Sequence, residues 1–171
     1  MKNVKILCYV FFINMISVFF ISFANASQNS TINVNGNVVR GTCSFLVDDQ
    51  IIKLEPVKPS DFGDFSIVNP AYYTLKFACP GAKGGLAKIN LTGTADENDT
   101  SAFVNTGTAE NVALRVVNTN WSTLVPGGTY YYTIKDGAGT INQYAGYVAT
   151  GKGPVSAGTF SSIVTYILNY Y

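Results

Sequence analysis

The sequence predicts an all-β domain built as an antiparallel sandwich or barrel. Tyr, Phe, Val, Ile and Thr are frequent, and they gather in short runs. Gly- and Asn-rich breaks separate these runs, including "VPGGTYYY" and "KDGAGT", whose Pro-Gly, Gly-Gly and Asp-Gly pairs favour tight turns. Beyond the first residues of the chain, no stretch keeps a helical period for three turns.

Eight runs have the length and composition of strands. They cover residues 31–47, with a break near Gly36 or Gly41, then 51–57, 72–79, 86–94, 112–118, 129–135, 144–150 and 159–170. Several alternate between two sets of side chains, so one face of each strand is expected to point into the core. The expected inward residues are Tyr73, Leu75, Phe77 and Cys79, then Val112, Leu114 and Val116, and finally Tyr130, Tyr132 and Ile134.

Residues 1–26 have the pattern of a secretion signal. Lys2 and Lys5 precede a long apolar run, and Ala24-Asn25-Ala26 has the small-x-small pattern that a signal peptidase cleaves. An uncleaved membrane anchor is the alternative, because the apolar run is long enough to span a bilayer. We favour cleavage, which leaves a mature chain of 145 residues that is expected to fold as one domain.

The composition argues against catalysis and nucleic-acid binding. Without the leader, nine basic residues oppose ten acidic ones, so no basic surface for nucleic acid is expected. The chain has no His, the most common general base and metal ligand. Two acidic clusters, Asp48-Asp49 and Asp96-Glu97-Asp99, could be paired carboxylates or a calcium loop, but neither has the EF-hand pattern. We therefore expect no enzyme activity, no metal and no cofactor.

Two cysteines, Cys43 and Cys79, remain once Cys8 is removed with the leader. In an oxidising compartment two thiols pair most simply with each other, so a disulfide is predicted; two free buried thiols are the alternative. Neither residue belongs to a C-x-x-C redox motif. The bond is therefore expected to be a structural staple.

Both ends of the mature chain alternate like strands. The N-terminal stretch "STINVNGNVV" places Ile32, Val34, Gly36 and Val38 on one face and asparagines on the other. The C-terminal stretch "GTFSSIVTYILNYY" places Phe160, Val164, Tyr166, Leu168 and Tyr170 on one face, with Ile163 and Ile167 on the other. The N-terminal pattern also suits an ordinary first strand paired inside its own sheet, and pattern alone leaves both possibilities open.

Together these segments resemble a known family. "STINVNGNVV" ahead of "GTCSF", then "LKFACPG", "NTGTAENVALRV" and the ending "GYVATGKGPVSAGTFSSIVTYILNYY" are similar to pilin subunits of chaperone-usher fimbriae of the type 1 kind. The resemblance covers the whole mature chain. Its most specific part is the ending, with a penultimate Tyr at Tyr170, alternating apolar residues before it, and Gly158 fourteen positions from the end. Ser162 interrupts the apolar series.

The resemblance implies an incomplete immunoglobulin-like sandwich that lacks its last strand. The resulting groove would receive a donor strand, first from a periplasmic chaperone and then, at the outer-membrane usher, from the N-terminal extension of a neighbouring subunit. The implied divisions are a signal peptide (1–26), a donor-strand extension (27–38) and a pilin domain (39–171). The implied donor side chains are Ile32, Val34, Gly36 and Val38. The implied groove and chaperone-binding strand comprises Gly158, Phe160, Val164, Tyr166, Leu168, Tyr170 and Tyr171.

The resemblance leaves the position in the fibre open. The N-terminal segment looks most like the tails of minor, linker-type subunits, whereas the size also suits a major shaft pilin. A receptor-binding adhesin is a third possibility, and Trp121 beside Asn118 and Asn120 could then stack on a sugar, although a lone Trp in a turn more often serves packing. We expect a minor or adaptor subunit, exported through the periplasm to a fimbria that supports bacterial adhesion and contacts any host receptor through the assembled fibre.

Overall fold

The computed structural model describes residues 42–63 and 66–170. The expected signal peptide, the donor-strand extension and Tyr171 lie outside the described residues. The strands are β1 (Ser44–Phe45), β2 (Val68–Ala78), β3 (Gly84–Thr92), β4 (Phe103–Val104), β5 (Val112–Asn118), β6 (Thr123–Leu124), β7 (Thr129–Lys135), β8 (Ala138–Ala149) and β9 (Thr165–Tyr170), with one short 3-10 helix, η1 (Pro59–Asp61). Within the described ranges, no helix has the length and apolar character needed to cross a membrane.

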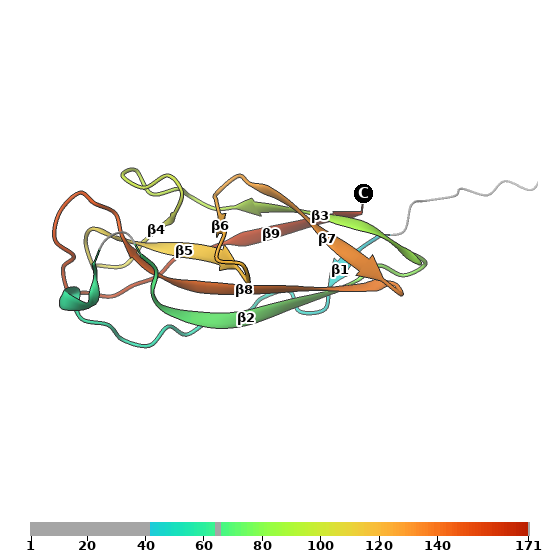
Figure 1. The fold of residues 1–171 in the computed structure, drawn as a ribbon, viewed down its shortest axis with the longest axis horizontal. Helices are drawn as coiled ribbons and strands as arrows, with labels where there is room; N and C mark the ends of the chain where they lie inside the picture. Colours follow the sequence, from blue (N-terminus) through green and yellow to red (C-terminus); the bar gives the residue numbers. More distant parts are fainter. Residues whose placement is uncertain (1–41, 64–65, 171) are drawn as a thin grey trace, which may run out of the picture. The chain divides into compact units, whose positions relative to one another are not determined.

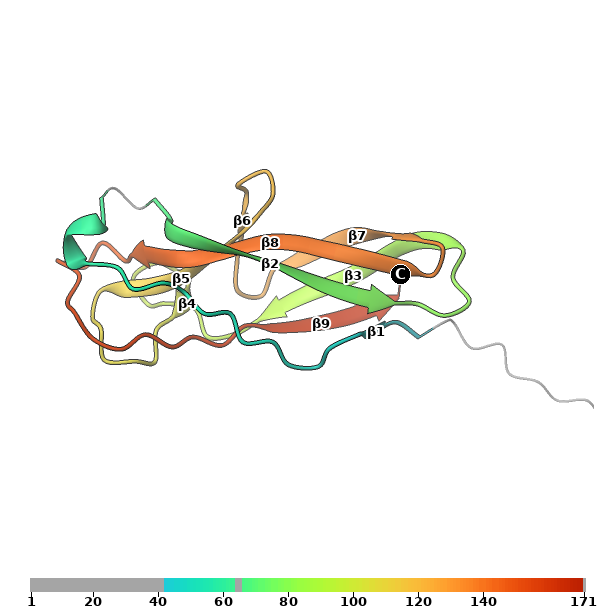
Figure 2. The ribbon, with the colours of Figure 1, turned by 90° about the horizontal axis from the view of Figure 1, so that it is seen from below.

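The strands form two antiparallel layers that are joined at one hairpin (Figures 1 and 2). In the first layer β2 lies between β1 and β8, and β8 also pairs with β5, which β4 and β6 flank. In the second layer β3 lies between β7 and β9. The hairpin between β7 and β8 links the layers through one register pair, Lys135 and Ala138. This arrangement confirms the predicted all-β sandwich.

The core lies between the two layers. Its largest fully buried side chains are Phe77, Phe103, Ile89, Leu91, Ile134, Ile141, Gln143, Val116, Val148 and Cys79. The inward faces predicted for β2 and β7 are confirmed, because Tyr73 and Ile134 are buried while Tyr131 is half exposed. On β5 the prediction was incomplete. Ala113, expected to face outward, is also buried, because it packs against Ala102 and Val148 on the outside of the first layer.

Two segments that were predicted as strands are not paired with a neighbouring strand over all of their predicted length. The prediction of a strand over residues 51–57 was wrong: Ile52 and Leu54 still turn toward the core, but β1 pairs with β2 over only two residues. Similarly, residues 159–164 belong to no strand, although their side chains alternate between partly buried and exposed, and β9 begins at Thr165. Their backbone instead bonds the loop after β4, where Ala109 N–H donates to the Thr159 carbonyl. Alternation therefore predicted which side chains face inward, but not which backbone is paired.

Candidate functional site

A groove of about 1000 Å³ with an apolar floor opens beside the two layers. One wall is formed by the segment from Phe45 to Leu54, and the other by residues 160–166. The floor consists of side chains from β2, β5 and β8, namely Tyr73, Leu75, Leu114, Val116, Ala145 and Tyr147. Most of these floor residues belong to or pack against the main core. The groove is therefore an extension of the hydrophobic core that reaches the surface.

The wall formed by residues 160–166 keeps the predicted alternation. Phe160, Val164 and Tyr166 turn toward the core, whereas Ile163 is 74% exposed. β9 pairs with β3 along one edge, and within the described residues no strand pairs with its other edge. A free strand edge presents unpaired N–H and C=O groups. The groove thus offers both an apolar floor and a backbone edge to which a further strand can bind.

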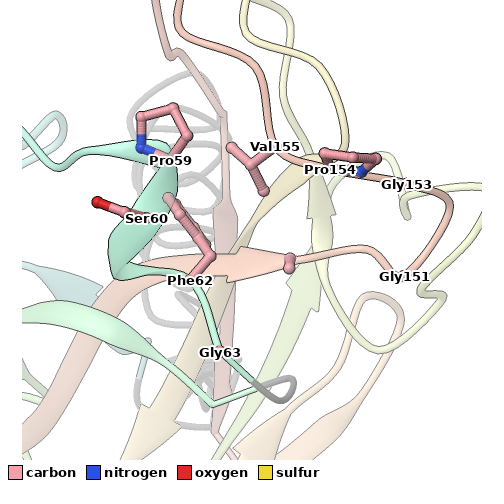
Figure 3. A pocket seen from close by; sticks show the side chains of 9 residues that line it. Pro59, Ser60, Phe62, Gly63, Gly151, Gly153, Pro154 and Val155 are labelled. Atoms are coloured by element: carbon pink, nitrogen blue, oxygen red, sulfur yellow. The ribbon is translucent and has the colours of Figure 1, made fainter.

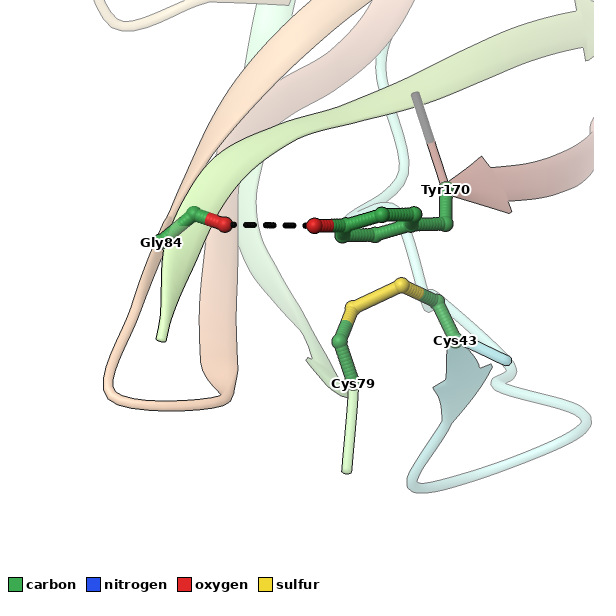
Figure 4. The surroundings of a disulfide bond; sticks show 4 residues. All are labelled: Cys43, Cys79, Gly84 and Tyr170. Atoms are coloured by element: carbon green, nitrogen blue, oxygen red, sulfur yellow. Dashed lines mark hydrogen bonds between the residues drawn. A yellow bond between two sulfur atoms is a disulfide. The ribbon is translucent and has the colours of Figure 1, made fainter. Parts of the chain in front are cut away.

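Beyond Tyr166, the wall strand is packed and tethered. Leu168 and Tyr170 pack against the main core, and Ile89 on β3 is the register partner of Leu168. The predicted disulfide between Cys43 and Cys79 is confirmed. Figure 4 shows the Tyr170 ring lying over this disulfide, with its hydroxyl donating to the Gly84 carbonyl at 3.5 Å. The lining of the groove consequently stops before this end of β9.

At the other end of the wall, Gly158 lies directly against the loop after β4. A Cβ atom at this position would come within 2.4 Å of the Ala109 amide nitrogen, so any side chain would displace backbone. Close packing of two segments thus accounts for glycine at this position. Nearby, a smaller pocket of about 520 Å³ is lined by residues that include Phe62 and Val155 (Figure 3). Edge-to-face contacts from Phe62 to Tyr147 and from Tyr147 to Phe160 connect this pocket to the groove.

A polar network crosses the core beneath the groove. Gln143 on β8 is fully buried, and its side-chain oxygen accepts hydrogen bonds from the hydroxyls of Tyr73 at 2.7 Å and Tyr166 at 2.5 Å. Its amide nitrogen donates to Tyr132 on β7 at 2.9 Å. Burial raises the pKa of Tyr73, Tyr132 and Tyr166, and the neighbouring Tyr73 raises that of Tyr166 further. The network therefore bonds the first layer to the second with neutral hydroxyls.

This network was not predicted from the sequence. The sequence does contain a sign of it: Ile141, Gln143, Ala145 and Tyr147 alternate along one face of the strand, so the Gln143 amide stands among inward-facing residues. The predicted strand, however, began only at residue 144. The first half of β8 was missed because the residues that precede position 144 are mostly polar.

The acidic cluster at Asp96, Glu97 and Asp99 has a structural role in its loop. The Asp96 carboxylate accepts the N–H groups of Asn98 and Asp99 at 2.9 and 3.0 Å. Asp99 in turn forms an ion pair with Arg115 of β5. In the part of the chain that the structure describes, no three His, Cys, Asp or Glu residues are placed to hold a metal.

Sequence comparison identifies the family. The profile of the family described as "Fimbrial protein" matches residues 32–171, most of the chain. The chain therefore belongs to the fimbrial protein family. A comparison with curated proteins gives no match.

Solved structures share the fold. A chaperone-usher pilus, from a study of rod uncoiling, matches at 21% identity with a TM-score of 0.64, covering 85% of this chain and 97% of that one. The P pilus rod subunit PapA matches at 22% identity with a TM-score of 0.64, covering 75% of this chain and 99% of that one. The CupB6 tip adhesin from Pseudomonas aeruginosa matches at 17% identity with a TM-score of 0.62, covering 75% of this chain and 38% of that one. The fold is accordingly an immunoglobulin-like sandwich that lacks a strand.

Proposed function

We propose that this fimbrial protein is a structural subunit of a chaperone-usher fimbria and polymerises by donor-strand exchange. The observation that carries the proposal is the apolar groove beside the free edge of the strand that ends the fold. A strand added there would cover the exposed floor and pair the backbone edge at once. This role is structural and requires no catalytic residue.

The N-terminal extension of the chain has the dimensions of such a strand. Ile32 to Val38 spans six residue steps, as does the wall from Phe160 to Tyr166, and each distance is about 20 Å when extended. On one face, Ile32, Val34 and Val38 would lie on the groove floor, while the asparagines would face solvent. Gly36 would allow the close approach that a Cβ would prevent. The extension of one subunit would thus complete the sandwich of the next.

A strand is also needed before assembly, because an open groove exposes apolar surface. We infer that a periplasmic chaperone supplies it along the segment that Gly158 begins, and that the outer-membrane usher directs the exchange. The subunit would then be exported through the periplasm to a fimbria on the cell surface.

The N-terminal extension is the feature that supports a position in the fibre. Its resemblance to linker-type tails supports a minor or adaptor subunit, with a major shaft pilin and a receptor-binding adhesin as the alternatives. Counting copies of this chain in isolated fimbriae by quantitative mass spectrometry distinguishes these roles. A few copies per fibre are expected, and an excess over all other subunits would instead identify the shaft pilin.

Deleting residues 27–38 tests the donor role. The truncated subunit should still bind the chaperone and accept a donor strand, because its groove is intact, but it cannot donate one. Mixed with the full-length chain, it should therefore shorten the fibres in proportion to its share, as seen by electron microscopy. Fibres formed by the truncated protein alone would refute donor-strand exchange through this segment.

Two substitutions on the same strand test the groove. Val164→Arg places a charge on the wall and should abolish binding of a synthetic peptide of residues 27–40. Ile167→Arg changes a side chain that is 45% exposed and absent from the groove lining, so it should leave peptide binding unchanged. Equal effects of the two changes would place the acceptor site elsewhere. Circular dichroism of both variants checks that the fold is retained.

A further inference from the structure

Three aromatic rings contact one another in a row on the outer face of the first layer, with Trp121 stacked on Tyr144 and Tyr72 tilted by 60° against it. Tyr72 on β2 and Tyr144 on β8 are register partners with ring centroids 5.2 Å apart. Trp121, in the turn between β5 and β6, lies over Tyr144 with centroids 5.0 Å apart and planes within 12° of parallel. Tyr72 and Trp121 are 55% and 56% exposed, and none of the three rings lines the groove. We call these residues the aromatic platform.

The turn that carries Trp121 holds the indole at the surface. Trp121 has a φ of 61°, in the left-handed region that bulky residues rarely adopt. Asn118 stabilises this conformation, because its side-chain oxygen accepts the N–H groups of Asn120 and Ser122, both at 2.9 Å. Its carbonyl also accepts the Trp121 N–H at 3.0 Å. Backbone strain of this kind is concentrated at functional sites.

The residues beside the platform are neutral and can form hydrogen bonds. Thr74 and Asn142 occupy the next outward register pair from Tyr72 and Tyr144, and the Thr74 hydroxyl donates to the Asn142 side chain at 3.0 Å. Asn120 is exposed in the turn itself. On β5, Arg115 points to the same outer face of the first layer, and its charge is balanced by Asp99. The side chains next to the three rings thus combine aromatic faces with amides and hydroxyls.

We propose that the aromatic platform binds a neutral hexopyranoside. A pyranose ring carries C–H groups on one face, which pack on an aromatic ring, and hydroxyls at its rim, which bond to amide and hydroxyl side chains. Three aromatic side chains match the size of one or two sugar rings. The surface area that they present is much smaller than the roughly 1,200–2,000 Å² that a stable protein interface buries. The side chains that adjoin the rings, Thr74, Asn142 and Asn120, are uncharged, which favours a neutral sugar over a sialylated or sulfated one. In a fibre, repeated copies would raise the avidity.

The single Trp of the chain makes the site directly measurable. The purified full chain is excited at the red edge of the indole band and titrated with the methyl glycosides of galactose, glucose and mannose. We expect a saturable change in emission with at least one of them and none with N-acetylneuraminic acid. Tyr72→Ala should weaken that affinity at least tenfold, whereas Tyr72→Phe should retain it because the ring remains. Tyr131→Ala, which removes a 50% exposed ring from β7, is the matched control and should bind normally.

The proposal is overturned by the absence of a saturable change with all three neutral glycosides. Equal affinity of Tyr72→Ala and the unaltered chain would overturn it as well. An emission change that follows protein concentration rather than sugar concentration would assign the platform to contacts between copies of the chain. On an array of neutral oligosaccharides, binding should be lost with Trp121→Ala, and retained binding would also count against the platform.

Discussion

The hydroxyl oxygens of Tyr73 and Tyr166 lie 2.5 Å apart and share the side-chain oxygen of Gln143. Tyr73 belongs to β2 in the first layer and Tyr166 to β9 in the second, so this contact bonds the groove wall to its floor. Because buried polar groups are costly unless they are paired, the network favours one placement of β9 over shifted ones. The wall is thereby held in position beside the groove.

This contact predicts loss of stability in alkali. Burial raises the pKa of Tyr73 and Tyr166 in the folded state, while tyrosines in the unfolded chain titrate at about pH 10. Above that pH the unfolded state therefore releases protons that the folded state retains, so the free energy of unfolding should decrease as pH rises. Below it, these groups should cause no pH dependence. Thermal melts across this range should show a shallower decrease for the Tyr73→Phe/Tyr166→Phe double variant, and an identical slope would contradict the assignment.

Replacing Gln143 with Leu should destabilise the fold. The substitution removes the shared partner of three tyrosine hydroxyls, although Tyr73 and Tyr166 can still bond to each other. Each buried group that remains unpaired costs about 1–3 kcal/mol. Asn142→Leu, at the exposed neighbouring position on β8, should change stability by only about 0.5 kcal/mol. Urea unfolding of both variants measures the difference. If Gln143→Leu were as stable as Asn142→Leu, the network would contribute nothing to stability.

Removing the disulfide should lower the free energy of unfolding by about 4 kcal/mol. Cys43 and Cys79 are separated by 36 residues, and the estimate follows from the chain entropy of a loop of that length. The Cys43→Ala/Cys79→Ala double variant provides the measurement. The unaltered chain unfolded in the presence of a reductant should lose a similar amount. A loss under about 1 kcal/mol in both experiments would show that the unfolded chain is already restricted without the bond.

Substituting Gly158 should destabilise the start of the groove wall. Gly158→Ala brings a methyl group within 2.4 Å of the Ala109 amide nitrogen, and overpacking of this kind costs about 1–3 kcal/mol. Gly63→Ala is the matched control, because nothing lies within 4 Å of its Cβ position. Amide hydrogen exchange should be faster at Ala109, whose N–H donates to Thr159. Unchanged exchange there, with unchanged stability, would contradict the packing argument.

The aromatic platform shows how far local pattern can predict a site. Trp121 with its flanking asparagines was recognisable from sequence as a candidate sugar contact, with core packing as the alternative. The structure places the indole at the surface, stacked on Tyr144. Tyr72 and Tyr144 could not be linked to it in advance, because the contact between them depends on the register of β2 with β8.

By itself, the sequence determined the all-β class, the inward face of most strands, the disulfide and the alternation of Phe160 to Tyr170. Each of these follows from local periodicity or from the pairing of two thiols. Only the tertiary structure decided that residues 51–57 form no strand, that Gln143 joins three tyrosines and that one edge of β9 is without a strand in the described residues. Alternation sets the direction of a side chain, but the pairing of a backbone edge depends on segments that are distant in the chain. For this reason alternation alone could not locate the groove, which the family resemblance implied and which forms where the two layers pack together.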